Sequence, residues 1–245
     1  MVQEAVKYRR IMLAYQPVVH ARQHDRIAYF EALIRIIDDA GRIVPAREFI
    51  EEIEKTETGR LLDCLALEEG LSTLVREPQL RLSVNMSARS IGHERWRGIL
   101  NHSIENDPTV AERLILEITE SSALEAPDQI AHFMAELHAQ GISFALDDFG
   151  SGFTTFRYFK QFSFDILKID GQFIRGIASD PDNQVITRAM LSIARHFDMF
   201  TVAEYVELED DAAFLADLGI DCLQGYHFGA PAFSPHWEND LRHLA

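Results

Sequence analysis

Short apolar runs alternate with longer amphipathic stretches along this chain, and the alternation predicts its secondary structure. We expect eight strands, at residues 13–19, 27–35, 81–87, 113–119, 143–149, 165–170, 200–206 and 221–225. Helical periodicity predicts helices at 46–55, 59–75, 128–140 and 182–197. Strands that alternate with helices form parallel sheets, and eight of them within 245 residues fit a closed barrel. The predicted fold is therefore an α/β protein with a TIM-like (β/α)8 barrel.

The connection between the first two strands departs from this pattern. Residues 20–26 are too few for the crossover that joins parallel strands, so we expect an antiparallel first strand, paired with the second as a hairpin. An open, doubly wound sheet is the alternative architecture. It is less favoured because no glycine-rich phosphate-binding turn follows the first strand.

Polar residues recur on one face of seven predicted strands, towards their carboxyl ends. Side chains alternate across a strand, so residues two apart share a face. That face carries Glu31, Asn85, Glu117, Asp147, Lys168, Glu204 and Gln224. A lone acid at a strand end is commonly a helix cap, but seven strands with a polar residue at the same end need another explanation. Barrels of this kind place their active sites at that mouth, so we expect a functional site there.

Composition and charge exclude several classes of partner. The chain has 39 acidic and 23 basic residues, a net charge of −16, which disfavours binding to nucleic-acid polymers and anionic membranes. Two cysteines, Cys64 and Cys222, indicate a reducing compartment rather than a disulfide framework. Neither a signal peptide nor a long apolar span is evident. We expect a cytoplasmic location, either alone or within a larger, membrane-attached protein.

The candidate site has the donor atoms of a hard metal ion. Carboxylates crowded at one mouth repel one another, and Lys168 alone does not neutralise them. Carboxylate and amide oxygens suit Mg²⁺ or Mn²⁺, whereas the histidines show no spacing typical of zinc. Asp147 and Asp148 are adjacent, so both reach one site only if the strand ends there. Such a pair bridges two metal ions roughly 3.5–4 Å apart in enzymes that hydrolyse phosphoesters.

An ordered set of motifs then points to a known family. The tripeptide Glu31-Ala32-Leu33 stands among the segments YQPVV (15–19), SVNMSARS (83–90), LEITES (116–121), ALDDFGSGF (145–153), DILKID (165–170), AEYVE (203–207) and QGYHFGAP (224–231). Together these resemble the EAL-domain cyclic di-GMP phosphodiesterases of bacteria, over nearly the whole chain. The resemblance implies one EAL domain across residues 1–245.

The resemblance also implies an activity and its residues. The family hydrolyses cyclic di-GMP to linear pGpG with Mg²⁺ or Mn²⁺, two ions per site. By their positions in the motifs, the residues that resemble metal ligands are Glu31, Asn85, Glu117, Asp147 and Asp148. Those that resemble catalytic or supporting residues are Lys168, near the attacking water, Glu204, Gln224 and Glu120, which braces the loop after Asp148. Those that resemble nucleotide-lining residues are Gln16, Leu33 and Arg35, the last near a phosphate. A homodimer is implied, as are sensor or diguanylate-cyclase domains outside this chain.

The chain departs from the family pattern at a few positions, and these leave alternatives open. Tyr205 stands where the family often has glycine, and the loop at 151–156 reads Ser-Gly-Phe-Thr-Thr-Phe. The metal and catalytic positions are all retained, which favours an active enzyme. The alternatives are a non-catalytic cyclic di-GMP receptor and an interaction module that only dimerises.

Overall fold

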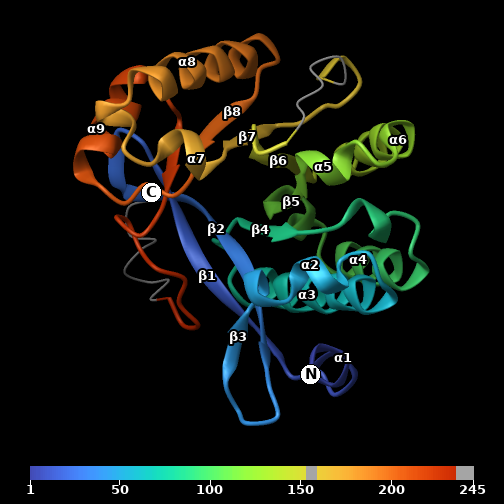
Figure 1. The fold of residues 1–245 in the computed structure, drawn as a ribbon. Coiled ribbons are helices and arrows are strands. Elements are labelled where there is room, and N and C mark those ends of the chain that lie inside the picture. Colours follow the sequence, from blue (N-terminus) through green and yellow to red (C-terminus); the bar gives the residue numbers. More distant parts are fainter. Residues whose placement is uncertain (153–158, 236–245) are drawn as a thin grey trace.

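A computed structural model describes residues 1–152 and 159–235 of the chain (Figure 1). Its strands form one sheet with the order β1-β9-β8-β7-β6-β5-β4-β2-β3, in which β1 also pairs with β2. The strands are β1 (Ile11–His20), β2 (Gln23–Ile37), β3 (Ile43–Pro45), β4 (Leu82–Asn85), β5 (Leu114–Thr119), β6 (Ser143–Phe149), β7 (Ile166–Ile169), β8 (Phe200–Ala203) and β9 (Cys222–Gln224). The pairing of β1 with both β9 and β2 closes the sheet, which confirms the predicted barrel and excludes the open sheet.

The strand directions also agree with the prediction. β1 runs antiparallel to β2 and to β9, whereas the neighbours from β2 through β4 to β9 pair in parallel. The predicted hairpin is thus confirmed. β3 pairs antiparallel with the end of β2, outside the closed ring, and was not predicted.

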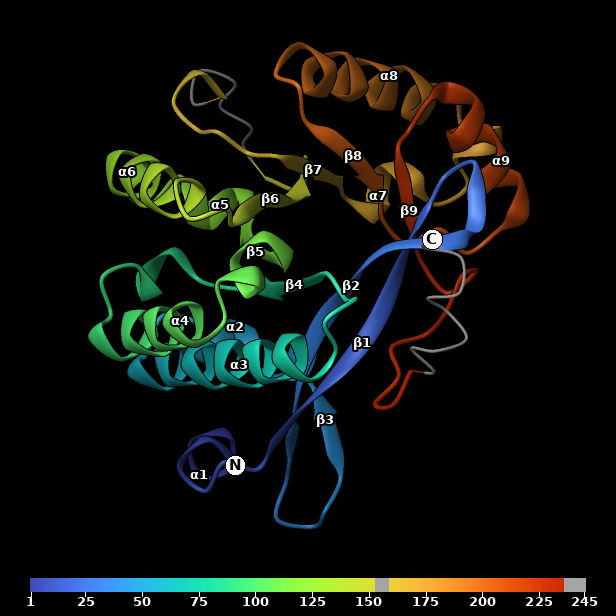
Figure 2. The same ribbon diagram turned by 180° about the vertical axis from the view of Figure 1, so that it is seen from behind.

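Helices surround the barrel on its outside, as both ribbon views show (Figures 1 and 2). They are α1 (Val2–Lys7), α2 (Ile50–Ile53), α3 (Glu57–Arg76), α4 (Glu94–Asn106), α5 (Glu120–Ala123), α6 (Pro127–His138), α7 (Gly171–Ile174), α8 (Pro181–His196) and α9 (Glu209–Leu218). Short 3₁₀ turns lie at η1 (Ala46–Glu48), η2 (Ala88–Ser90), η3 (Pro108–Arg113) and η5 (Ile177–Ser179). No helix in the described ranges has both the length and the apolar character needed to cross a membrane.

The single helix predicted at 46–55 is wrong. The structure divides that segment into η1 and α2, and Phe49 between them has φ −145°, outside the helical region. Phe49 is buried in a cluster with Ile53 and residues of α1 and α3. Burial of this ring against its neighbours thus overrides the helical periodicity of the segment.

Two apolar clusters account for the packing of the barrel. The larger one fills the space between the outer face of the strands and the helices. A smaller one joins seven strands through residues that share the inward face with the site: Val18, Tyr29, Ile115, Ala145, Ile166, Val202 and Cys222. Each of these lies two residues from a predicted polar site residue, on the same strand or, for Val202, directly after its end. The barrel interior is therefore apolar towards the amino end of the parallel strands and polar at their carboxyl end.

Candidate metal and active site

Lys168 lies at the centre of the mouth, surrounded by carboxylates from four other strands or strand ends. Its Nζ is 2.8 Å from Glu117 Oε2, 2.8 Å from Asp147 Oδ1 and 2.8 Å from Glu204 Oε1. Glu31 Oε2 is 3.4 Å away. All five side chains are buried, with Lys168 at 0% exposure. The structure thus brings together the inward-facing residues of β2, β5, β6 and β7 with Glu204, which directly follows β8.

A bulge in β6 places two adjacent acids at this mouth. Leu146 pairs with Leu167 and Phe149 pairs with Ile169, so Asp147 and Asp148 together stand opposite Lys168. Asp148 has φ +54°, a left-handed conformation that aspartate adopts more readily than most residues. β6 ends at Phe149, one residue after the pair, as the sequence predicts, and the bulge directs both carboxylates to one site.

Amide side chains hold the Glu31 carboxylate from two sides. Asn85 Nδ2 donates to Glu31 Oε1 at 2.8 Å, and Gln224 Nε2 donates to Glu31 Oε2 at 2.6 Å. Gln224 also donates to Gln16 Oε1 at 3.3 Å, and Gln16 Nε2 donates to the Gly229 carbonyl at 3.1 Å. Gln16 therefore belongs to the same network, one step from the acidic cluster.

Burial and mutual repulsion perturb the ionisation of the cluster. Burial raises the pKa of Glu117 to about 8, and the Glu31 carboxylate adds to the rise. Burial likewise raises the pKa of Glu204 well above its usual value. For Asp148, burial and the adjacent Asp147 raise the pKa to about 6. Of these three acids, Glu117 and Glu204 therefore favour the protonated form at neutral pH unless more positive charge is supplied.

Two members of the cluster, Glu31 and Lys168, have pKa values shifted in favour of their charged forms, because each is paired with groups of opposite charge or with hydrogen-bond donors. Burial acts to raise the pKa of Glu31, but the Lys168 ammonium and the two amide donors outweigh it and lower that pKa. Burial acts to lower the pKa of Lys168, yet the carboxylates around it outweigh burial and raise that pKa well above its usual value. Lys168 is thus a firmly held ammonium in this structure.

The donor atoms fit a divalent cation. One oxygen each of Asp147, Asp148 and Glu204 lies within 4.8 Å of the other two. Glu117 Oε1 is buried and has no hydrogen-bond partner among the described residues, although Glu117 Oε2 contacts Lys168. The amide nitrogen of Asn85 is used by Glu31, so its oxygen is the atom left for a cation. Hard oxygen donors and excess negative charge match Mg²⁺ or Mn²⁺.

The remaining predicted residues lie around the cluster rather than in it. Glu120 is buried at the start of α5, and its Oε2 accepts a hydrogen bond from the Gly150 amide at 3.1 Å. Leu33 and Arg35 follow Glu31 on β2 towards the rim and are half-buried. Arg35 donates to the Ile34 carbonyl at 3.0 Å. Of the loop at 151–156, the part from Phe153 onward lies outside the described residues.

Three supporting residues were not predicted from the sequence. Asp63 on α3 accepts hydrogen bonds from the Ser87 amide at 3.0 Å and from Ser90 Oγ at 2.6 Å, which holds the turn after Asn85. Ser122 accepts from the Ala88 amide at 2.8 Å, and Gln172 donates to the Gly150 carbonyl at 3.1 Å. Asp63 interrupts an otherwise apolar helical run, which is the one signal that the sequence offers for any of them.

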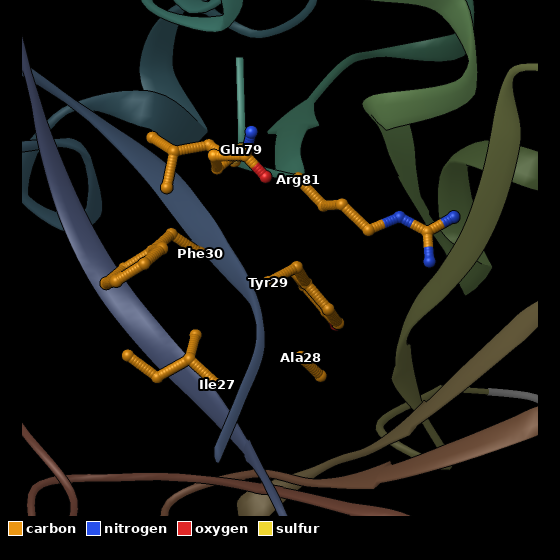
Figure 3. A pocket seen from close by; sticks show the side chains of 7 residues that line it. Ile27, Ala28, Tyr29, Phe30, Gln79 and Arg81 are labelled. Atoms are coloured by element: carbon orange, nitrogen blue, oxygen red, sulfur yellow. The ribbon is translucent and has the colours of Figure 1, made fainter. Parts of the chain in front are cut away.

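A pocket of about 200 Å³ lies elsewhere on the barrel (Figure 3). Its lining comes from the beginning of β2 and the segment before β4: Ile27, Ala28, Tyr29, Phe30, Gln79, Leu80 and Arg81. These residues precede Glu31 and Asn85 on strands that run in parallel, so the pocket lies at the amino end of the barrel. It is therefore separate from the acidic cluster.

These features are typical of one class of protein, the closed β/α barrels that carry an acidic cluster at the carboxyl mouth. Within that class the chain belongs to the EAL domain family, whose model matches residues 1–231. The match covers every described strand and helix.

Several curated relatives are named cyclic di-GMP phosphodiesterases. The cyclic di-GMP phosphodiesterase PdeB of Shewanella oneidensis is 29% identical over 234 residues, 94% of this chain and 27% of that protein. The cyclic di-GMP phosphodiesterase PdeF of Escherichia coli is 30% identical over 234 residues, 94% of this chain and 31% of that protein. The chain therefore spans about a third or less of the length of these relatives.

Solved structures support the same assignment. The PaMucR phosphodiesterase in complex with c-di-GMP superposes with a TM-score of 0.81 at 30% identity, over 94% of this chain and 95% of that one. The EAL domain of FimX superposes with a TM-score of 0.85, over 95% of each chain, at 22% identity. The second likeness concerns the fold alone.

Proposed function

We propose that this chain is a divalent-cation-dependent phosphodiesterase that hydrolyses cyclic di-GMP to linear pGpG. The observation that carries the proposal is the buried ring of carboxylates around Lys168, in which one Glu117 oxygen has no hydrogen-bond partner within residues 1–152 and 159–235. Relatives of similar sequence are named cyclic di-GMP phosphodiesterases, and one solved relative is a complex with c-di-GMP. A non-catalytic receptor has no need of so many acids at the mouth.

We assign the metal to the residues whose carboxylate and amide oxygens converge at the mouth. Glu31, Asn85, Glu117, Asp147 and Asp148 would hold two Mg²⁺ or Mn²⁺ ions, with Glu204 and Gln224 beside them. Such ions, when bound, lower the pKa of a bound water and offset charge on the phosphoryl oxygens. The mouth is acidic and the substrate is an anion, so substrate affinity should depend strongly on the cation.

The side chains of the chain have separate tasks in the hydrolysis. A water oxygen forms a bond to phosphorus, the bond from phosphorus to the 3′ oxygen breaks, and the proton that the water loses is balanced by one that the 3′ oxygen gains. The product therefore keeps a 5′ phosphate and has a 3′ hydroxyl. Lys168 keeps its proton on Nζ and donates a hydrogen bond to the attacking water. Glu204 orients that water by accepting from it. Arg35 lies nearer the rim, where its guanidinium pairs with a phosphate, and Gln16 and Leu33 line the nucleotide.

One experiment separates the three possible functions. Purified protein is incubated with cyclic di-GMP and either Mg²⁺ or Mn²⁺, and pGpG is measured by chromatography. Appearance of pGpG supports the phosphodiesterase, and binding of cyclic di-GMP without pGpG supports a receptor. If the protein neither binds cyclic di-GMP nor produces pGpG, the interaction module is supported.

The site assignment is tested with a matched pair of variants. Glu31→Ala removes a carboxylate of the cluster and is expected to abolish turnover. Glu207→Ala makes the same change at an exposed position of the β8–α9 segment and should leave turnover at the unaltered level. Full activity of Glu31→Ala would contradict the assigned site.

We further propose that the chain forms a homodimer, acts in the cytoplasm and works beside sensor or diguanylate-cyclase domains outside residues 1–245. The length of the relatives supports the last point, since this chain spans only 27% and 31% of the two named above. Light scattering of the purified chain tests the dimer: a monomer mass at micromolar concentration would contradict it.

A further inference from the structure

Tyr205 has a backbone conformation that is unusual for an aromatic residue. It directly follows Glu204 at the end of β8 and has φ +55°, in the left-handed region. Bulky residues rarely adopt this region, and they remain there only where the surrounding contacts hold them. Asp148, which has φ +54° at the same mouth, also belongs to the acidic cluster. Two strained positions thus flank the same candidate metal site.

The contacts of the Tyr205 ring explain how this conformation is held. A Cβ placed on Gly171 would lie 2.4 Å from Tyr205 Cδ2 and 2.7 Å from its Cγ, so the ring packs directly on the glycine backbone. The Arg175 guanidinium lies 4.3 Å from the ring centroid, a cation–π contact. Gly171 and Arg175 stand at the beginning and directly after the end of α7. The ring is therefore attached to that helix, although the residue remains 49% exposed.

The same helix is attached to the segment that carries Asp148. Gln172 Nε2 donates to the Gly150 carbonyl at 3.1 Å, two residues after Asp148. A Cβ on Gly150 would lie 2.6 Å from Phe173 Cε2, so this ring packs against the Gly150 backbone. α7 therefore contacts both the peptide after Glu204 and the peptide after the Asp147–Asp148 bulge.

These contacts connect the backbone next to Glu204 with the backbone next to the candidate metal ligands Asp147 and Asp148. We infer that Tyr205 is a positioning residue for the metal site, which fixes the Glu204 carboxylate relative to Asp147 and Asp148 through α7. The inference rests on the proposed metal site. The three carboxylates already have oxygens within 4.8 Å of one another, the arrangement that the link would preserve. The ring, rather than the hydroxyl, makes the contacts that matter.

Three substitutions at this position separate the ring from the backbone. Tyr205→Phe keeps the ring and removes only the hydroxyl. Tyr205→Asn removes the ring but tolerates left-handed backbone, and Tyr205→Gly removes the ring and also frees the backbone. Mn²⁺ affinity is measured without substrate by electron paramagnetic resonance, and stability by urea denaturation of the same samples.

We expect Tyr205→Asn and Tyr205→Gly to bind Mn²⁺ about tenfold more weakly, the lower end of effects seen when support around metal ligands is lost. Their urea midpoints should stay at or above that of the unaltered protein, because the backbone strain is relieved. Tyr205→Phe should bind Mn²⁺ with unaltered affinity.

The possible outcomes distinguish this inference from the proposed function. Equal Mn²⁺ affinity in all four proteins would overturn the inference alone. Weaker binding by Tyr205→Phe to the same extent as by Tyr205→Asn would also overturn it, because the hydroxyl would then be responsible. An unaltered protein that binds no Mn²⁺ would overturn the metal site of the proposed function and this inference with it.

Discussion

Replacing Lys168 with methionine removes the ammonium at the centre of the acidic cluster and leaves the barrel interior filled. Methionine keeps an unbranched side chain of similar length but removes the ammonium, whose Nζ lies 2.8 Å from oxygens of Glu117, Asp147 and Glu204. Lys168 is fully buried, so no water replaces the lost charge. Removal of one partner from a buried ion pair typically lowers the unfolding free energy by about 3–5 kcal/mol. We expect a loss of this size at pH 8 without divalent cations.

The loss should shrink as the pH falls. The folded-state pKa of Glu117 is about 8, above the value of an unfolded glutamate, so the folded protein takes up protons between those two values as the pH is lowered. Without the ammonium, the pKa values of the neighbouring carboxylates rise further, and protonation then replaces the missing charge. At pH 6 the variant should therefore recover part of its stability relative to the unaltered protein.

Urea denaturation followed by circular dichroism measures both effects. The unaltered protein, Lys168→Met and the control Lys160→Met, whose lysine is exposed, are compared at pH 8 and pH 6 in a chelator. The control should differ from the unaltered protein by no more than about 0.5 kcal/mol. The expectation fails if the unfolding free energy of Lys168→Met at pH 8 lies within about 0.5 kcal/mol of that of the unaltered protein. It also fails if the loss of unfolding free energy is the same at pH 8 and pH 6.

Three further predictions concern the support of the site. Gly150→Ala should lose about 2–4 kcal/mol of unfolding free energy, because Gly150 has φ +95° and a Cβ there would lie 2.6 Å from Phe173. The control Gly41→Ala, at φ +79° with no described atom within 4 Å of its Cβ, should lose only about 1 kcal/mol. Equal losses for the two variants in a thermal melt would contradict the role of the Phe173 contact. Glu120→Ala should leave the Gly150 amide without its hydrogen bond and lower the unfolding free energy by about 1–3 kcal/mol. It should also raise the Mn²⁺ concentration that gives half-maximal turnover. An unchanged Mn²⁺ requirement would count against a role of Glu120 in supporting the site. Asp63→Asn should raise the unfolding free energy by about 1–3 kcal/mol at pH 8 and leave it unchanged below pH 4. Burial raises the pKa of Asp63 to about 6, so the unaltered protein loses stability as the pH rises from the ordinary aspartate pKa to that value. A stability difference in urea that does not change with pH would argue against this prediction.

The strand pattern and the inward face could be predicted because both follow from local periodicity. Each predicted strand overlaps an observed one, and the parity rule placed Glu31, Glu117, Asp147 and Lys168 on one face. A closed barrel brings the ends of all its strands to one mouth, so residues far apart in sequence converge without further information. This is why the cluster could be predicted from strand ends alone.

The bulge and the supporting contacts could not be predicted in this way. Adjacent residues normally face opposite sides of a strand, and only the pairing with β7 shows that Asp148 stands beside Asp147. Asp63 holds the turn after Asn85 from a helix, a contact made between segments 24 residues apart or more. The interruption at Phe49 depends on the packing of α1 and α3 against it. Each of these features depends on tertiary packing, which local patterns do not encode.

Anomalous diffraction from crystals grown with Mn²⁺ locates bound manganese ions independently of any activity. We expect strong anomalous peaks at the carboxyl mouth of the barrel, within bonding distance of oxygens from Glu31, Asn85, Glu117, Asp147 and Asp148. Crystals that show no manganese peak at this mouth, while these side chains keep the positions described, would contradict the proposed metal site.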